Sequence, residues 1–202
     1  GGMNPVIELA AAGVADTARR AAALLCAPGT VLLLPTETVY GLVCRADDET
    51  AVRRIYELKG RAAAKKLGWF VADWRKLPEY GVVLDGLPAK LAERYCPGPI
   101  TIIAPLQNGD TVGFRVPDHP LLAEILKLAG CPLAQTSANR SGEPDARNLS
   151  AALAGLTGEV TLAVDGGAIA ENALASTVVD AAGTELRILR QGSLHLEDFQ
   201  NR

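Results

Sequence analysis

The sequence is poor in the residues on which many catalytic and metal sites depend. Only two histidines, His119 and His195, occur in 202 residues, and no serine, histidine and acid arrangement is visible. Proton-shuttle chemistry built on imidazole is therefore disfavoured. The four cysteines lack the paired spacing of a zinc site or a redox dithiol. We expect no metal site built from histidine and cysteine, and we expect the cysteines to be small core residues in a reducing compartment.

Long apolar runs are also missing. No run approaches the roughly 18 residues of a membrane span, and the start of the chain lacks a basic segment followed by an apolar one. These absences predict a cytoplasmic protein without a membrane partner. Gly1-Gly2, ahead of Met3, is interpreted as a cloning remnant and carries no weight in the prediction.

Aromatic residues make up only 4% of the chain, and the net charge is −3. Both values disfavour a protein whose whole surface binds nucleic acid, although a local basic cleft is compatible with them. The 49% of hydrophobic and 21% of charged residues are typical of a soluble globular protein. The length predicts one domain with a core of its own.

Helical and strand-like segments alternate along the chain. Helices are expected at 16–25, with Asp16 as the N-cap, and at 49–58, 87–95, 120–129 and 148–156. Strands are expected at 30–34, 69–71, 100–106, 111–116, 132–135, 162–164, 176–180 and 186–189. This interleaving predicts an α/β protein with a three-layer fold around a mixed sheet. The expected domain covers 16–194, after an N-terminal segment 1–15 and before a C-terminal tail 195–202.

The stretch "PTETVYGL", residues 35–42, follows the first expected strand directly. Pro35 should end the ladder of that strand. If the chain stays extended beyond it, Thr36, Thr38 and Tyr40 share one face and form a hydroxyl-bearing wall. The alternative is a polar strand edge, in which threonine and tyrosine serve β-propensity alone.

Cations gather in "ELKGRAAAKK", at the end of the second expected helix: Lys59, Arg61, Lys65 and Lys66. They could bind an anionic ligand. Equally, cations at a helix C-terminus complement the helix dipole for roughly 0.3–1 kcal/mol without any further role. Arg115 in "VGFRVPDHP" has the same two interpretations, as a ligand-binding residue or as an exposed strand charge.

The loop "QTSANRSGEPDAR", residues 135–147, follows a short buried strand, where α/β proteins usually bind ligands. Ser137, Asn139 and Arg147 offer hydroxyl, amide and guanidinium groups suited to phosphate or carboxylate oxygens, and a plain surface loop is the alternative. Ser176 and Arg190 mark the closing "STVVD…LRILRQG". Neither a Walker sequence nor a dinucleotide fingerprint is present.

In order, these stretches resemble the YrdC/TsaC family of threonylcarbamoyl-adenylate synthases. The family pattern runs "PTETVYGL", "KxRP", "WPGPxT", "VxVRxP", "TSANxSG" and "STVVD…RxG". This sequence reads "PTETVYGL", "KGRA", "CPGPIT", "VGFRVP", "TSANRSG", "STVVD" and "LRQG", from roughly Asp16 to Ser193. Longer members carry an extra C-terminal domain, and we expect a single-domain form here.

The resemblance implies a nucleotidyltransferase with a twisted mixed sheet and a basic concave cleft. It joins L-threonine, bicarbonate or CO2, and ATP into L-threonylcarbamoyl-AMP and releases pyrophosphate. The product serves the t6A modification of adenosine 37 in tRNA, and separate transferase proteins make the final transfer. Weak direct binding of tRNA is a further expected interaction. Mg²⁺ is expected with ATP, held by phosphate oxygens and water and by no assigned protein ligand.

Residue by residue, the resemblance implies three overlapping sets. The reacting centre is Lys59, Arg61, Ser137 and Asn139. The threonine site is Thr36, Arg115, Ser137 and Ser176. The ATP site is Lys59, Arg61, Lys65, Thr111, Asn139, Arg147 and Arg190. Three places depart from the family pattern: Ala62 replaces a proline, Cys96 replaces a tryptophan, and Leu67-Gly68-Trp69 is unusual in the stretch that helps enclose threonine.

Two other functions fit parts of the pattern. A non-catalytic module could hold double-stranded RNA or tRNA in the same basic cleft, although the net charge and the few aromatics disfavour it. A related enzyme could form a carbamoyl-adenylate on another acceptor. It would keep Lys59, Arg61, Ser137 and Asn139 and change the wall made by Thr36, Arg115 and Ser176.

Overall fold

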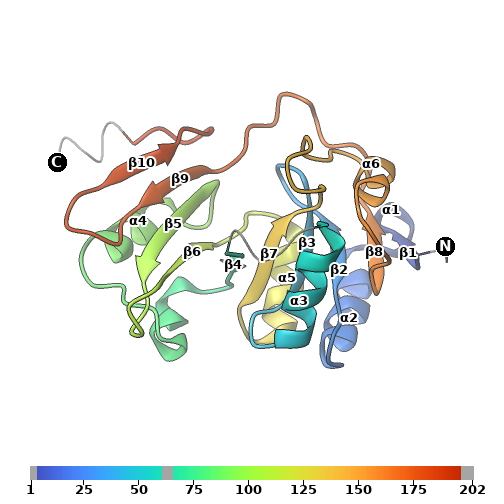
Figure 1. The fold of residues 1–202 in the computed structure, drawn as a ribbon, viewed down its shortest axis with the longest axis horizontal. Helices are drawn as coiled ribbons and strands as arrows, with labels where there is room; N and C mark the ends of the chain where they lie inside the picture. The colour runs from blue at the N-terminus through green and yellow to red at the C-terminus, as the bar shows by residue number, and fades with distance from the viewer. Residues whose placement is uncertain (1–3, 61–65, 197–202) are drawn as a thin grey trace.

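The structure, a computed structural model, describes residues 4–60 and 66–196 (Figure 1). Within these ranges the strands form one mixed sheet in the order β1-β8-β2-β3-β7-β4-β6-β5-β9-β10. The strands are β1 (Val6–Glu8), β2 (Leu32–Pro35), β3 (Tyr40–Arg45), β4 (Gly68–Phe70), β5 (Ile100–Pro105), β6 (Thr111–Arg115), β7 (Leu133–Ser137), β8 (Leu162–Asp165), β9 (Thr177–Asp180) and β10 (Arg187–Arg190).

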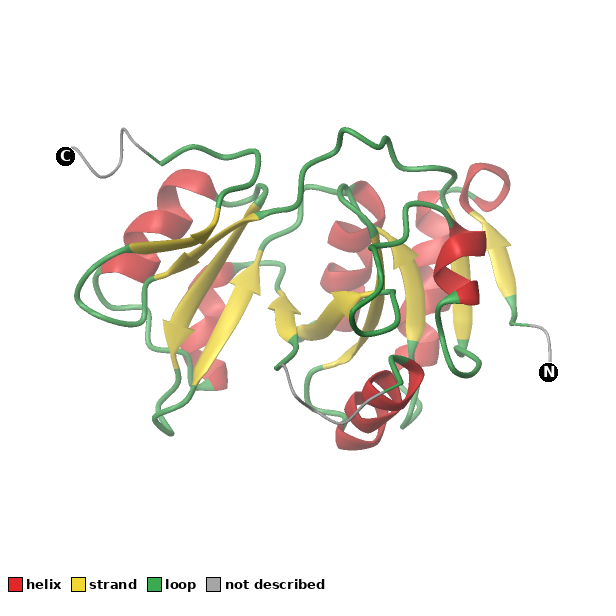
Figure 2. Ribbon diagram, turned by 45° about the horizontal axis from the view of Figure 1, so that its top comes forward, coloured by secondary structure: helices red, strands yellow, loops and turns green. Residues whose placement is uncertain are grey.

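Helices cover both faces of the sheet, as Figure 2 shows. The helical elements are α1 (Leu9–Ala12), α2 (Val14–Leu25), α3 (Glu49–Leu58), the 3-10 helix η1 (Trp74–Tyr80), α4 (Leu87–Tyr95), α5 (Pro120–Ala129) and α6 (Leu149–Ala154). In the part of the chain that the structure describes, none of them is both long and apolar enough to span a bilayer. The α/β fold with a large mixed sheet between helices confirms the expected fold class.

The core consists of three clusters that follow these layers. Helices α2 and α5 pack on one face of β1, β8, β2 and β3 through residues such as Leu25, Leu32 and Ile125. Helices α3 and α6 pack on the opposite face, around Leu33 and Ile55. The third cluster joins η1 and α4 to β5, β6 and β9. Each fully buried leucine or isoleucine contributes about 1.5–3 kcal/mol relative to an exposed one, so the sheet between these layers is a rigid support.

Helix ends follow local signals. Asp48 caps α3 by accepting from the Ala51 N–H at 3.0 Å, and Asn148 caps α6 by accepting from the Ala151 N–H at 2.8 Å. Gly130 ends α5 in the left-handed region, at φ +69°. The expectation for Asp16 was wrong, because α2 begins at Val14 with Gly13 as its N-cap and Asp16 lies in the first turn.

The stretch "PTETVYGL" forms a hairpin, so the condition of a chain that stays extended beyond Pro35 is not met. Strand β2 ends at Pro35, which pairs with Tyr40 at the start of β3. Tyr40 is buried and its hydroxyl donates to the Gly167 carbonyl at 2.6 Å, so it supports the neighbouring loop instead of sharing a wall with the threonines. Strand β3 was not predicted, because its burial on both faces leaves no alternating pattern.

Other elements were missed too, among them β1, which pairs in parallel with β8 although it lies in the expected N-terminal segment. The prediction that all cysteines are core residues holds for Cys44, which is buried, and was wrong for Cys26, which is exposed. Cys26 is the C-cap residue of α2, at the surface end of that helix.

Candidate active site

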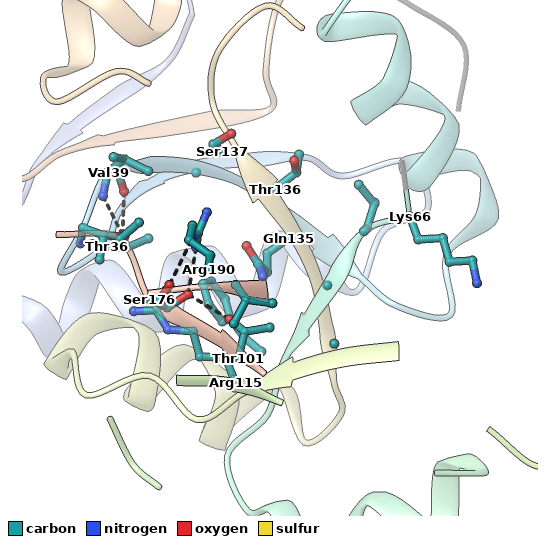
Figure 3. Close-up of a pocket in the computed structure, with 18 of the residues that line it drawn as sticks. Thr36, Val39, Lys66, Thr101, Arg115, Gln135, Thr136, Ser137, Ser176 and Arg190 are labelled. Carbon is teal, nitrogen blue, oxygen red and sulfur yellow. Dashed lines mark hydrogen bonds between the residues drawn. The ribbon is translucent and has the colours of Figure 1, made fainter. Parts of the chain in front are cut away.

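A cavity of about 410 Å³ lies over the middle of the sheet, where β7, β4, β6, β5 and β9 adjoin. Most of the predicted site residues within the described ranges line it: Thr36, Thr111, Arg115, Ser137, Ser176 and Arg190. Its charged lining residues among those described are Lys66, Arg115, Arg190 and the exposed Asp145. Figure 3 shows Arg115 of β6, Ser176 just before β9 and Arg190 of β10 together in this cavity.

The turn between β2 and β3 forms one wall. The Thr36 hydroxyl donates to the Val39 carbonyl at 2.6 Å and accepts from the Thr38 and Val39 N–H groups, both at 3.1 Å. The Thr36 and Thr38 hydroxyls are also 3.1 Å apart. Because a threonine hydroxyl carries one proton, the bond to Val39 uses the Thr36 donor and fixes this turn.

Arg115 lies at the base of the cavity and forms an ion pair with Glu37 of the same turn. Its side chain is only 7% exposed and that of Glu37 is 24% exposed. Burial, helped by the nearby charge of Arg190, lowers the pKa of Arg115 to about 10. The guanidinium remains a cation at neutral pH, with a planar fork of donors suited to carboxylates. Glu37 lies inside the "PTET" motif but was not among the predicted site residues.

On the other side of the cavity, Ser176 is hydrogen-bonded to Arg190, the last residue of β10. Arg190 donates through Nε to the Ser176 carbonyl at 3.0 Å and through Nη2 to the Ser176 hydroxyl at 3.2 Å. The Ser176 hydroxyl also lies 2.9 Å from the hydroxyl of Thr101. Thr101 closes the "CPGPIT" motif, so a signal for it was present in the sequence and was not used.

A second group of polar side chains adjoins the cavity at Ser137. The Lys59 ammonium donates to the Ser137 carbonyl at 2.7 Å and to Asn139 Oδ1 at 3.2 Å. The Ser137 hydroxyl donates to the same Asn139 oxygen at 2.5 Å. In turn, Asn139 Nδ2 donates to the Glu143 carbonyl at 2.7 Å. These bonds lock the C-terminal end of α3 to the loop after β7 and hold a cation at the edge of the cavity.

Some predicted residues lie elsewhere. Lys59, Asn139 and Arg147 are absent from the cavity lining. Arg147 Nη1 donates to the carbonyls of Ala170 and Ala173 at 3.0 and 3.1 Å and to that of Thr38 at 3.5 Å. It therefore fastens the segment after β8 to the site loop. Arg61 and Lys65 fall outside the described residues. Lys66 lines the cavity and forms an exposed ion pair with Asp110 of the β5–β6 turn.

In the described ranges, no group of three or more His, Cys, Asp or Glu side chains is placed to hold a metal ion. Gln135 is a cavity residue that the sequence analysis named only as part of a loop motif. The Gln135 side chain lies over Gly68 of the neighbouring strand β4. A single sequence does not reveal that these two residues are paired.

A family model described as Sua5_yciO_yrdC, telomere recombination, matches residues 25–192. The threonylcarbamoyl-AMP synthase of Pyrococcus abyssi is 34% identical over 181 residues, which cover 85% of this chain and 53% of that protein. The threonylcarbamoyl-AMP synthase of Chromohalobacter salexigens is 38% identical over 167 residues, covering 78% of this chain and 89% of that protein.

Solved structures agree with the sequence relatives. The structure of Pyrococcus abyssi Sua5 complexed with L-threonine superimposes with a TM-score of 0.82 at 30% identity. The match covers 99% of this chain and 60% of that chain. The chain thus spans about half the length of the Pyrococcus abyssi relative.

Proposed function

The chain belongs to the Sua5/YciO/YrdC family, and we propose that it is an L-threonylcarbamoyladenylate synthase. The observation that carries the proposal is the meeting of two residue groups at one cavity. One wall holds Thr36, Arg115 and Ser176, and Ser137 of the same lining is hydrogen-bonded to Lys59, which lies beside the cavity together with Asn139. A cavity with these two ends can hold an amino acid beside a nucleotide.

The proposed reaction joins three substrates in two steps. The amine of L-threonine attacks CO2, supplied as such or from bicarbonate, and loses a proton to give a carbamate. A carbamate oxygen then attacks the α-phosphorus of ATP in line. The new P–O bond forms as the bond to the bridging oxygen breaks, and pyrophosphate leaves with that electron pair. Such transfers need positioning and charge stabilisation more than a protein nucleophile.

Threonine would lie against the wall of Thr36, Arg115 and Ser176. Arg115 already holds the carboxylate of Glu37. A guanidinium has five N–H donors and can pair with a second carboxylate, so Arg115 suits the α-carboxylate of the amino acid. The wall is buried and rigid: Thr36 is 6% and Ser176 5% exposed. The likeness to Pyrococcus abyssi Sua5 complexed with L-threonine supports this assignment.

The nucleotide would occupy the opposite end. Lys59 lies where the phosphates and carbamate must approach one another, and a fixed ammonium offsets their mutual repulsion. Ser137 and Asn139 orient the α-phosphate. Thr111 is a further contact, and Arg190, which is held by Ser176, would contact the nucleotide from the threonine wall. Mg²⁺ would enter with ATP, held by phosphate oxygens and water, and would neutralise charge on the leaving pyrophosphate. Arg61 and Lys65 remain proposed phosphate contacts on sequence grounds.

In this proposal the protein acts in the cytoplasm at the first step of tRNA t6A modification. The product is a mixed anhydride, so a separate transferase that binds tRNA must consume it. Any direct binding of tRNA by this chain would be weak.

The test is pyrophosphate release from ATP with L-threonine or bicarbonate omitted in turn. A synthase requires both. Release that is indifferent to threonine would point to a carbamoyl-adenylate formed on another acceptor. No release, together with tight and salt-sensitive binding of RNA, would contradict the proposal in favour of an RNA-binding module.

A further inference from the structure

The floor of the cavity contains two glycines in neighbouring strands. Gly68 of β4 and Gly113 of β6 both line the cavity, and their strands pair in parallel at Trp69 and Phe114, one residue further along. Neither glycine has a positive φ. Their backbone conformations are therefore open to other residues. The glycines are not needed for a turn; their lack of a side chain leaves space above the strands.

The side chain of Gln135 occupies the space above Gly68. Gln135 pairs with Gly68 across β7 and β4. A methyl group added at Gly68 would stand 2.7 Å from Gln135 Nε2, 3.2 Å from the Gly113 carbonyl oxygen and 3.7 Å from Gln135 Cδ. Gln135 Nε2 is the nearest atom, so the carboxamide lies directly over the glycine. Gln135 is half-buried and lines the cavity. Figure 3 shows it in the same hollow as Arg115, Ser176 and Arg190.

The carboxamide of Gln135 makes no hydrogen bond to any described residue, in contrast to its polar neighbours. Ser176 is engaged by Arg190 and Thr101, and Thr36 is engaged by the backbone of its own turn. Gln135 thus presents a donor and an acceptor together to whatever enters the cavity.

The opposite side of the glycine floor is apolar. A methyl group added at Gly113 would lie 3.1 Å from Cγ2 of Thr101, whose hydroxyl is turned to Ser176. The hollow therefore has a methyl group on one side and a carboxamide on the other. A side chain that carries a methyl and a hydroxyl on one carbon complements both sides.

We propose that Gln135 determines acceptor specificity by hydrogen-bonding the side-chain hydroxyl of a β-hydroxy amino acid in this hollow. The inference rests on the proposed function for the identity of the reaction and adds the residue that reads the acceptor. Valine has the shape of threonine with a methyl in place of the hydroxyl. A site built to hydrogen-bond a hydroxyl disfavours such an isostere, because its own polar group is left unpaired.

The experiment compares L-threonine with L-valine, both as acceptors in ATP-dependent pyrophosphate release and as ligands in titration calorimetry. In Gln135→Leu, which keeps the size of the side chain and removes its polar atoms, the preference for threonine should fall about tenfold, the value of one net hydrogen bond. Gln107→Leu makes the same change at an exposed position outside the cavity and should leave the preference unchanged.

A second variant tests the glycine. Gly68→Ala should displace the carboxamide and lower the same preference. Gly183→Ala is its control, because a methyl group there meets nothing within 4 Å and φ is not positive. If Gly68 acts only through Gln135, the double variant Gly68→Ala with Gln135→Leu should prefer threonine over valine as much as Gln135→Leu alone does.

The outcomes separate this inference from the proposed function. Turnover with an unchanged threonine-to-valine ratio in Gln135→Leu, or an equal loss for both amino acids, would overturn the role of Gln135 and leave the synthase intact. Binding that depends on Gln135 and prefers threonine, without pyrophosphate release, would support the inference and contradict the synthase. Failure of the unaltered protein to bind either amino acid, with or without ATP, would overturn both.

Discussion

Arg115 of β6 and Glu37 of the β2–β3 turn form an ion pair at the base of the cavity. The pair links strands that lie on opposite sides of β7 and β4 in the sheet. It places a fixed carboxylate beside the guanidinium that we assign to the amino acid. The charge of Arg115 is thus already paired before substrate enters.

Removing one member of this pair should destabilise the fold more than removing both. We expect Arg115→Met to lower the free energy of unfolding by about 2 kcal/mol, because it leaves a mostly buried carboxylate without its partner. Arg115→Met combined with Glu37→Gln should recover part of the loss. Urea denaturation measures both variants, and losses that simply add would show that the two charges do not interact.

Lys59 should be required for turnover. We expect Lys59→Met to lower the rate of pyrophosphate release at least about a hundredfold, as loss of a preorganised charge at the reacting centre does. Its stability should fall by about 1 kcal/mol, because the Ser137 carbonyl and Asn139 lose a donor. Lys90→Met, at an exposed position on α4, is the matched control. A variant with full activity would exclude Lys59 from the reacting centre.

Stability should depend on pH through His119. Burial and the nearby charge of Arg115 lower the pKa of His119 below its ordinary 6.5, and its Nδ1 is buried with no hydrogen-bond partner in the described ranges. As pH falls below 6.5, the unfolded chain takes up a proton that the folded protein resists, so stability is lost. Chemical denaturation between pH 7.5 and 5.5 should show this slope, and His119→Asn should flatten it.

The comparison for this pH dependence is the unaltered protein, measured over the same pH range. If His119→Asn leaves the dependence unchanged, the titration of His119 does not control stability in this range.

The cysteines should differ in reactivity by burial. Burial raises the pKa of Cys44 to about 12 and that of Cys96 to about 11, and the thiolate is the reactive form. Cys26 is exposed. Alkylation at pH 8, followed by mass spectrometry, should modify Cys26 first and Cys44 last. Early modification of Cys44 in the folded protein would contradict its position in the core.

Local signals in the sequence were enough for much of the fold. Helices α4 and α5 have the predicted bounds, because proline, glycine and the apolar period mark their ends within the segment itself. Strand β3 was missed because it is buried on both faces and begins two residues after Thr38 without a strong turn signal.

For the site, the motifs identified the residues around the cavity but not the pairs they form. The partner of Glu37 is remote in the sequence, at Arg115. The position of Gln135 depends on an absent side chain at Gly68 in another strand. Contacts of this kind arise from strand pairing, which a single sequence does not encode locally. For Arg147 the motif predicted a ligand contact. The structure shows that its partners are backbone carbonyls, which the motif did not indicate.

The central claim is that one cavity brings a carboxylated amino acid and ATP together for adenylate formation. Its most direct test is incubation of the protein with ATP, L-threonine and ¹³C-bicarbonate, followed by mass spectrometry of the nucleotide products. We expect an adenylate that carries both threonine and the ¹³C label, and loss of that species in Lys59→Met. Unlabelled AMP, ADP or unchanged ATP as the only nucleotides would contradict it.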